Sequence, residues 1–366
     1  MDISSPPTNT QNSSVATTLF AVPTLSVQAQ SVAPSFDVIT TPPQLIPGLD
    51  SYSVSCPTWD FCMAVGNTSE PYISPDAMQW NGIYWENVSI TGSLILVGAL
   101  TGISCPTENW CMAVGYFGML ETPAAFIWQP NTGWMRSATG SLGSSQSTSG
   151  ALNAISCTSE TFCVAGGFQQ SDTPNSEDSL VVEWNGTTWT TIPNAQGTVL
   201  QDSVYTLSCA SKTFCMVAGE GASNFSIWNG TSWQAISQPN LPYQFDVSDL
   251  TCLSPNYCMG ITSARNQVTP EIVWDGFSWS EIPSPLGSGN SFFSSVSCAT
   301  EEFCVFVGGD EISIYNGSSF TNTSNTNGIF LSDVSCSSTS ACIAVGTGSR
   351  SQNNVVAESW FSGIPK

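Results

Sequence analysis

The chain has 366 residues, no histidine, 14 cysteines, and five Lys and Arg against 27 Asp and Glu, for a formal net charge of -22. The lack of histidine excludes His-based catalytic triads and histidine-ligated metals, and the shortage of basic residues argues against nucleic acid as a partner, because its phosphates must be neutralised. Only 9% of the residues are charged, compared with about 25% in ordinary domains, which favours an acidic external medium or a glycosylated surface.

Residues 1–34 are expected to form a leader that precedes the folded domain at residues 35–366. This segment is rich in Ser, Thr, Pro and Gln, and Asp2 is its one charged residue. Such a composition is typical of a flexible tether, and self-association by adding a strand to a neighbouring subunit is the alternative. The segment lacks a basic start, so no signal peptide is assigned. No apolar run approaches the roughly 20 residues of a membrane span.

The first predicted element of the folded domain is a hairpin at 54–66, "VSCPTWDFCMAVG", with two cysteines six positions apart. This phrase recurs six more times and uses every cysteine, which indicates a repeat architecture. Residues directly opposite in an antiparallel pair lie roughly 4.5 or 5.5 Å apart, within reach of a disulfide. We therefore predict one disulfide within each copy: Cys56 with Cys62, Cys105 with Cys111, Cys157 with Cys163, Cys209 with Cys215, Cys252 with Cys258, Cys298 with Cys304, and Cys336 with Cys342.

Zinc binding and thioredoxin-like redox chemistry are the alternatives for the paired cysteines. Zinc ligand pairs have two to four intervening residues, and redox pairs have two. Five residues separate the cysteines here, so both alternatives are disfavoured. Paired cysteines imply an oxidising compartment, and we expect an extracellular or cell-surface protein.

A second predicted hairpin follows in each of the first six copies, where two aromatic residues flank a turn. Trp184-Asn185-Gly186 followed by Trp189 is one example, and Trp274-Asp275-Gly276 followed by Trp279 is another. Asn-Gly and Asp-Gly are strong hairpin signals, because both turn positions favour positive φ. Each unit therefore contains four strands, and the fold class is predicted as all-β, a seven-bladed β-propeller of four-stranded blades with one disulfide per blade.

The seventh copy ends early, at Trp360 and Gly363, without its last strand. Residues 35–43, "SFDVITTPP", match the missing part. We predict that Phe36 to Thr41 forms the outer strand of the last blade, which would otherwise expose an unpaired edge.

The Trp-[Asn/Asp]-Gly-x-x-Trp turn resembles the Asp-box (BNR-type) hairpin of sialidase-like propellers, and the cysteine hairpins resemble those of secreted bacterial propeller repeats. The resemblance covers residues 35–366 and implies a propeller. Only "VWDGFSW" keeps the aspartate, and a repeated turn is scaffold, so the resemblance says little about chemistry.

Function is expected on the face from which the variable connections emerge, between the second and third strands of a blade and between successive blades; we name it the divergent face. The opposite face, which carries the short hairpin turns, is the turn face. Variable loops on a rigid scaffold are the usual place for binding residues. The candidate residues on the divergent face are Asp76, Glu121, Asp172, Asp202, Glu220, Asp246, Arg265, Asp310 and Arg350. Candidate glycosylation sites are Asn67, Asn87, Asn224 and Asn322.

The sequence favours a binding protein that recognises a partner protein or a polysaccharide, without a cofactor. A carboxylate-dependent glycoside hydrolase or lyase is the first alternative, but no spacing singles out the pair of acids that it needs. A structural subunit of a surface layer or filament is the second. A lectin with one site per blade is disfavoured, because the repeated residues are cysteines, turns and core. Oxygen-rich loops offer calcium ligands, but no EF-hand string appears.

Overall fold

The computed structural model describes residues 1, 37–40, 49–68, 73–88, 90, 97–118, 121–137, 149–170, 177–192, 203–219, 225–264, 268–286, 292–324, 329–348 and 355–361. By compactness the chain divides into two units, Met1–Pro34 and Ser35–Lys366. Beyond Met1, the first unit lies outside the described residues, as does the predicted strand-adding role of that segment.

All regular structure in the described residues is β-strand, arranged in seven four-stranded antiparallel sheets. Six sheets each use four consecutive strands. In the first three of these the strands are β2 (Leu49–Thr58), β3 (Phe61–Thr68), β4 (Ser74–Trp80) and β5 (Trp85–Asn87); β6 (Gly98–Thr107), β7 (Trp110–Phe117), β8 (Thr122–Gln129) and β9 (Gly133–Arg136); β10 (Gly150–Ser159), β11 (Phe162–Gln170), β12 (Glu177–Trp184) and β13 (Trp189–Thr191).

The other three continue the same pattern along the chain. Their strands are β14 (Val204–Ser211), β15 (Phe214–Gly219), β16 (Ser226–Trp228) and β17 (Trp233–Ala235); β18 (Asp246–Ser254), β19 (Tyr257–Ser263), β20 (Glu271–Trp274) and β21 (Trp279–Ile282); β22 (Ser295–Thr300), β23 (Phe303–Gly308), β24 (Glu311–Tyr315) and β25 (Phe320–Ser324). The remaining sheet has the order β1 (Asp37–Thr40), β28 (Val355–Phe361), β27 (Ala341–Gly348), β26 (Ile329–Ser338).

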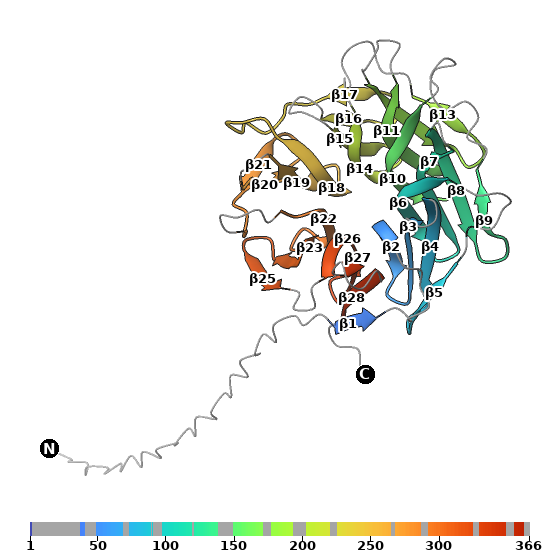
Figure 1. Ribbon diagram of the computed structural model, residues 1–366. Coiled ribbons are helices and arrows are strands. Elements are labelled where there is room, and N and C mark those ends of the chain that lie inside the picture. The colour runs from blue at the N-terminus through green and yellow to red at the C-terminus, as the bar shows by residue number, and fades with distance from the viewer. Residues whose placement is uncertain are drawn as a thin grey trace. The chain divides into compact units, whose positions relative to one another are not determined.

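The innermost strand of each sheet lies at the centre of a ring; it is the first of the four strands in six sheets and β26 in the remaining one. Contacts run in sequence from β2 to β6, β10, β14, β18, β22 and β26, and then from β26 back to β2. Figure 1 shows the sheets arranged around this centre, with the outermost strand of each, such as β5, β9 and β1, at the periphery. This arrangement is a β-propeller.

The expected count of seven blades has to be corrected to six blades that are each complete within one stretch of chain. The remaining sheet is a composite of both ends of the chain. Its outer strand β1 pairs with β28, with Asp37 opposite Ser359 and Thr40 opposite Val356. The strand is shorter than the predicted Phe36 to Thr41, and Phe36 and Thr41 lie outside the described residues.

Every predicted disulfide is present. Each joins the first two strands of its own sheet, and the Cα atoms of each pair lie 3.9–4.1 Å apart. There are no free cysteines. Because Cys157 lies directly opposite Cys163, and Cys209 opposite Cys215, the bridge closes the end of the hairpin. These cysteines therefore act as structural clips within each sheet.

A belt of serine hydroxyls joins neighbouring sheets at the inner strands. The serine before the first cysteine of one sheet accepts a hydrogen bond from the backbone N–H of the first cysteine of the next. The pairs and their N to Oγ distances are Cys105 with Ser55, 2.9 Å; Cys157 with Ser104, 3.0 Å; Cys209 with Ser156, 2.9 Å; Cys252 with Ser208, 2.9 Å; Cys336 with Ser297, 3.0 Å; and Cys56 with Ser335, 3.0 Å. The last pair joins the composite sheet to the β2 sheet. The Ser-Cys dipeptide of the repeat therefore links sheets as well as clipping hairpins.

Two aspartates strengthen this belt on one side of the ring. Asp249 Oδ2 accepts a hydrogen bond from the Val296 N–H of the next sheet at 2.8 Å. Asp333 Oδ2 accepts one from the Val54 N–H at 2.7 Å, across the junction of the composite sheet with the β2 sheet. Ser295 donates to Asp333 Oδ1 at 2.5 Å. Each carboxylate thus ties two inner strands together.

The aromatic turns differ from the prediction in their geometry. The turn between Trp184 and Trp189 has four residues, and in it only Gly186 has a positive φ, of 95°. Asn185 keeps an ordinary φ, and its Oδ1 accepts hydrogen bonds from the Thr187 N–H at 3.0 Å and the Thr188 N–H at 2.9 Å. The expectation of positive φ at both positions is therefore wrong, because the Asn185 side chain accepts hydrogen bonds from the backbone two and three residues on and so stabilises the turn with an ordinary φ.

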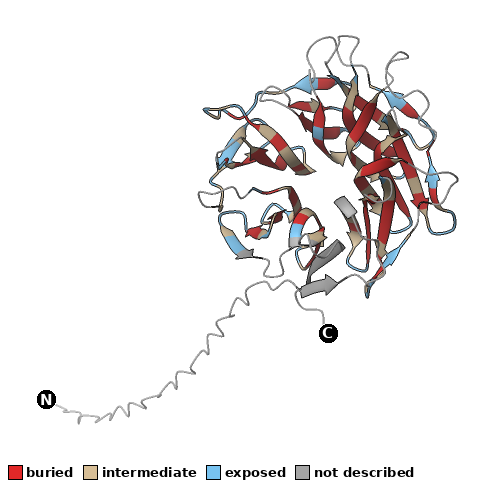
Figure 2. Ribbon diagram, viewed as in Figure 1, coloured by how far each residue is buried: buried red, intermediate tan, exposed pale blue. Residues whose placement is uncertain are grey.

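The hydrophobic core lies between neighbouring sheets. One cluster, for example, combines Phe61 and Met63 of β3 with Trp128 of β8 in the next sheet. The rings of Phe61 and Trp128 pack in a tilted arrangement, with centroids 5.4 Å apart. Figure 2 shows buried residues concentrated on the inner and middle strands and exposed residues at the periphery. Within the described residues, clusters of this kind recur between neighbouring sheets around the ring.

Candidate functional site

The divergent face carries four of the predicted binding residues within the described part of the chain. Asp76, Glu121, Asp246 and Asp310 come from four different sheets or their loops. Glu121 and Asp310 are exposed, whereas Asp246 is half-buried. The other five, Asp172, Asp202, Glu220, Arg265 and Arg350, lie outside the described residues.

Asp76 is buried within its sheet, with an exposed fraction of 5%. Its Oδ1 accepts a hydrogen bond from Asn87 Nδ2 at 3.0 Å. Burial raises the pKa of this carboxyl above its ordinary value, while the Asn87 amide and the Ala77 backbone act in the opposite direction. Asp76 therefore links β4 to β5 as part of the sheet.

Three of the four candidate glycosylation sites fall in strands of the described structure. Asn67 is half-buried in β3, and Asn87 and Asn322 are exposed in β5 and β25. The Asn322 amide donates to the Pro285 carbonyl at 3.1 Å, and its Oδ1 accepts from Ser313 at 2.9 Å. Asn224 lies outside the described residues. Glycosylation at these positions stays a prediction.

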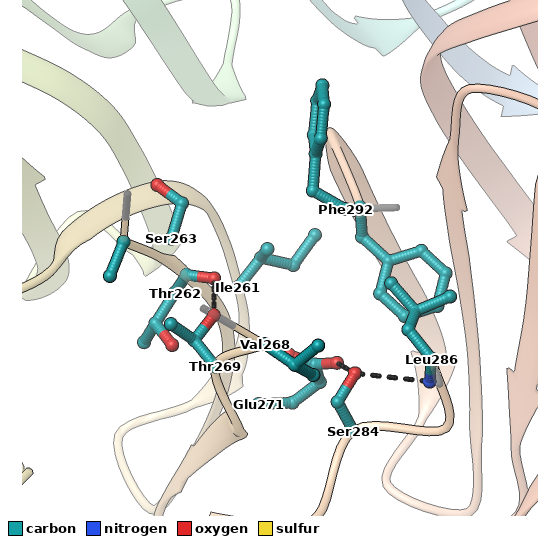
Figure 3. A pocket seen from close by; sticks show the side chains of 11 residues that line it. Ile261, Thr262, Ser263, Val268, Thr269, Glu271, Ser284, Leu286 and Phe292 are labelled. Atoms are coloured by element: carbon teal, nitrogen blue, oxygen red, sulfur yellow. Dashed lines mark hydrogen bonds between the residues drawn. The ribbon is translucent and has the colours of Figure 1, made fainter. Parts of the chain in front are cut away.

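A pocket opens on the divergent face beside the β18–β21 sheet. It lies between the end of β19, the start of β20, and the connection that leads from β21 to β22. It has a volume of about 40 Å³. The residues that line it are Ile261, Thr262, Ser263, Ala264, Val268, Thr269, Glu271, Ser284, Leu286, Phe292 and Phe293 (Figure 3).

The polar part of this pocket is a carboxyl group at its base. Glu271 has an exposed fraction of 1%, and Ser284 Oγ donates a hydrogen bond to its Oε1 at 2.7 Å. Ser284 is held in turn by the Leu286 N–H at 3.4 Å. Burial raises the pKa of Glu271 to about 8, with the Ser284 hydrogen bond acting in the opposite direction. The pocket thus holds a carboxyl group whose charge depends on pH near neutrality.

Threonine hydroxyls hold the loop that forms one wall of the pocket. Thr262 Oγ1 donates to the Pro270 carbonyl at 2.6 Å, and Thr269 Oγ1 donates to the Thr262 carbonyl. These bonds join the end of β19 to the residues just before β20 and leave Val268 at the surface. Hydrogen bonds of Thr262 and Thr269 therefore hold this wall of the pocket in place.

The rim of the pocket is apolar and exposed. The exposed fractions of Phe292 and Val268 are 64% and 37%. Figure 3 shows Phe292 at the rim, pointing away from Glu271 and Ser284. An apolar rim around a small number of placed polar groups is typical of ligand sites.

Sequence reasoning missed Glu271, although the repeats contain its signal. Glu271 stands three residues before the first aromatic of its copy, Trp274, and the other complete copies have an apolar residue at that place. Those residues are Ala77, Ala125, Val181, Phe225 and Ile312. A single acid at a position that is otherwise part of the core marks a local departure from the scaffold, and such departures are expected at functional sites.

Among the described residues, the lining of the pocket contains one carboxyl group, that of Glu271. Glycoside hydrolysis uses two acids that flank the bond. Within the described residues, no group of three or more His, Cys, Asp or Glu side chains is placed to hold a metal ion. In that same part of the chain, no helix is long and apolar enough to cross a membrane.

Comparison with known proteins shows the fold but no family. No protein-family model matches the chain, and no curated protein matches it. Many solved structures are similar. A structure of YCF48 bound to a D1 peptide is 12% identical over 94% of this chain and 100% of that one, with a TM-score of 0.61. The WD40 β-propeller domain of Doa1 is 12% identical over 89% and 97%, with a TM-score of 0.60. YCF48 from Cyanidioschyzon merolae is 9% identical over 89% and 98%, with a TM-score of 0.59.

At these identities the comparisons confirm that the chain is a propeller and show its fold alone. The propeller implied by the resemblance to Asp-box repeats is therefore confirmed at the level of fold. The relationship to the Asp-box family itself stays a prediction.

Proposed function

We propose that this protein is an interaction propeller that binds a partner protein at its divergent face, through the pocket around Glu271. The pocket carries the proposal, because it joins an exposed apolar rim to a buried polar group. Such a combination suits a side chain that a partner inserts. YCF48, a structural neighbour, is described bound to a peptide, which supports a peptide or protein as the class of ligand.

We infer further that the protein works outside the reducing cytoplasm. Seven disulfides, one in every sheet, are typical of proteins in oxidising environments. Secretion, glycosylation of the exposed Asn87 and Asn322, and recognition of a polysaccharide are parts of this proposal that need their own tests.

The proposal is tested by selecting ligands without prior choice of sequence. The immobilised protein is screened against a random peptide library and, in parallel, against a glycan array. We expect peptides whose binding falls at least tenfold in a Phe292→Ser variant, because the exposed ring forms the rim of the site.

Phe277→Ser is the matched control, since Phe277 is also an exposed phenylalanine, with an exposed fraction of 91%, but lies on the turn face. Binding that is lost with Phe277→Ser and kept with Phe292→Ser would place the site on the wrong face. If the protein bound glycans but no peptide, the proposed ligand would be a polysaccharide and not a partner protein. Release of sugars from the glycans would favour an enzyme.

A further inference from the structure

We propose that the Glu271 pocket receives a lysine side chain of the partner, a proposal that rests on the function proposed above and specifies its ligand. The lysine ammonium group would pair with the Glu271 carboxylate, and its methylene chain would pack against the apolar rim. Three independent features of the molecule carry this inference: the buried acid, the size and lining of the pocket, and the charge of the chain.

The first feature is the position of the acid. Glu271 is almost completely buried, and within the described residues the partner of its carboxyl group is the Ser284 hydroxyl. A buried charge is costly unless it is paired. The other complete repeats avoid this cost by placing an apolar residue there. A cation brought by a ligand would supply the counter-charge that none of the described residues places beside Glu271.

The second feature is the shape and lining of the pocket. A volume of about 40 Å³ exceeds the roughly 10–15 Å³ that a cavity needs to hold one water molecule, so the pocket has room for a small polar group. The lysine ammonium is such a group, a compact point charge at the end of a flexible stem. Above the acid, Val268, Leu286 and Phe292 offer apolar surface. Lysine buries its methylene stem along such a surface while its charged end reaches a polar group.

The third feature is electrostatic complementarity. The chain has a formal net charge of -22, with five Lys and Arg against 27 Asp and Glu. A protein of this charge attracts basic partners over long distances and repels acidic ones. Above pH 8, where Glu271 is ionised, the long-range charge and the carboxylate at the base of the pocket have the same sign, which favours a basic side chain over a neutral one.

Among the residues that the structure describes, the titratable groups near the pocket are few, so the pH dependence of binding can be assigned to them. Tyr243, from the segment before β18, has a pKa raised above its ordinary value of 10.0 by burial, then by the charges of Glu281 and Glu271. The lining residues contributed by β19 and by the segment before β22 are uncharged. Between pH 6 and 9, Glu271 is therefore the group in the pocket whose charge changes.

The test uses the full chain and the pentapeptide acetyl-Gly-Gly-Lys-Gly-Gly-amide, with binding followed by NMR chemical-shift titration at pH 6, 7, 8 and 9. The matched probe carries acetyl-lysine, which keeps the stem and loses the charge. We expect the lysine peptide to bind at least tenfold more tightly than the acetylated one at pH 9. Its affinity is expected to fall about tenfold for each pH unit below 8, as Glu271 takes up a proton.

Variants separate the pocket from the general charge of the protein. Glu271→Gln, which keeps the size of the side chain, should abolish the preference for lysine. Glu281→Gln removes an exposed acid from the same sheet and should change the affinity less than twofold. If Glu271→Gln fails to fold, the comparison of the two peptides across pH in the unaltered chain still decides the matter.

Several outcomes would overturn the proposal. Equal affinity for both peptides is one, and no binding of the lysine peptide at 10 mM and pH 9 is another. The third is an affinity for either peptide that rises as pH falls, which would mean that the protonated carboxyl group donates a hydrogen bond to a neutral group of the ligand. A library peptide that needs Phe292 but is indifferent to Glu271→Gln would reject the lysine ligand and retain the function proposed above. Failure of every library peptide would reject that function instead.

Discussion

At the scale of single residues, buried carboxyl groups distinguish this protein. Burial raises the pKa of Asp249 to about 6, with a smaller contribution from the charge of Asp333. Burial also raises the pKa of Asp333, against hydrogen bonds from Ser295, Val54 and Val334 and one with Ser53. Both residues are half-buried. The inner strands that surround their carboxyl groups exclude most of the water that would hydrate them, and this raises the two pKa values.

Because these pKa values are raised, the protein should be more stable in acid than at neutral pH. In the unfolded chain, Glu271 releases its proton near pH 4.5, whereas in the folded chain it holds the proton until about pH 8. The stabilising contribution is complete below pH 4.5 and is lost as pH rises through 8. Asp249 behaves in the same way between pH 3.8 and about 6. Since a tenfold change in proton affinity equals about 1.4 kcal/mol, we expect a loss of several kcal/mol for Glu271.

Urea unfolding between pH 4 and 9 checks this prediction. The free energy of unfolding should decrease as pH rises, and Glu271→Gln should reduce the decrease above pH 6. Glu86→Gln, an exposed acid of β5, is the control and should leave the profile unchanged. A free energy of unfolding that increases from pH 5 to 8 would show that the buried acids ionise at ordinary pH. The acidic medium favoured by the composition would then lose its physical support.

At the scale of elements, the cysteine hairpin is the unit from which the ring is built. Its disulfide closes the hairpin within one sheet, and the serine before the first cysteine joins that hairpin to the next. A register shift near the end of the hairpin brings the strands unusually close. A Cβ atom added to Gly115, for example, would come within 2.0 Å of the Ala99 carbonyl oxygen. The same limit applies to the glycines at the matching place in four other copies, Gly167, Gly219, Gly308 and Gly346, whereas the fifth copy has Thr262 there.

The contribution of the serine belt can be measured at one link. Ser156→Ala removes the acceptor of the Cys209 N–H and leaves that donor without its partner in a half-buried position. We expect the free energy of unfolding to fall by about 1 kcal/mol, measured by the midpoint of urea unfolding. Thr190→Ala is the control, because the Thr190 hydroxyl is exposed and its bond to the Glu183 carbonyl is long, at 3.4 Å. Equal effects of the two variants would show that the belt adds nothing to stability.

At the scale of the whole molecule, the ring is closed by the junction of the composite sheet with the β2 sheet. Cys56 and Val54 of β2 donate their backbone N–H groups to Ser335 and Asp333 of β26. The outer edge of the composite sheet is covered by β1. A closed ring leaves only short protected edges, which limits aggregation through strand edges.

Removal of β1 tests this closure. A chain that begins at residue 42 lacks β1, so the edge of β28 is exposed. A chain that begins at residue 35 keeps β1, and β28 remains paired. We expect the first to melt at a lower temperature and to associate into larger species at high concentration, as followed by light scattering. The chain from residue 35 is expected to behave as the full chain does. Identical melting temperatures for all three would mean that β1 does not stabilise the ring.

The sequence predicts the features that depend on neighbouring residues or on the repeated pattern. The pairing of Cys157 with Cys163, the turn at Asn185 and Gly186, and the strand that completes the last repeat depend on residues close together or on a pattern that repeats. These were read from the sequence alone, although the turn at Asn185 has a different backbone geometry from the one expected. The divergent face was expected to carry the site, but the acids proposed there fall in different sheets or outside the described residues.

The pocket around Glu271 and the belt of serines were decided only by the tertiary structure. Both depend on which side chains of one sheet meet the backbone of the next, and that contact is set by how the sheets pack around the ring. Local periodicity, hairpin turns and disulfide spacing are properties of neighbouring residues, so the amino-acid sequence by itself determines them. A buried carboxyl group acquires its chemistry from the segments that enclose it, and only the packed ring brings those segments together.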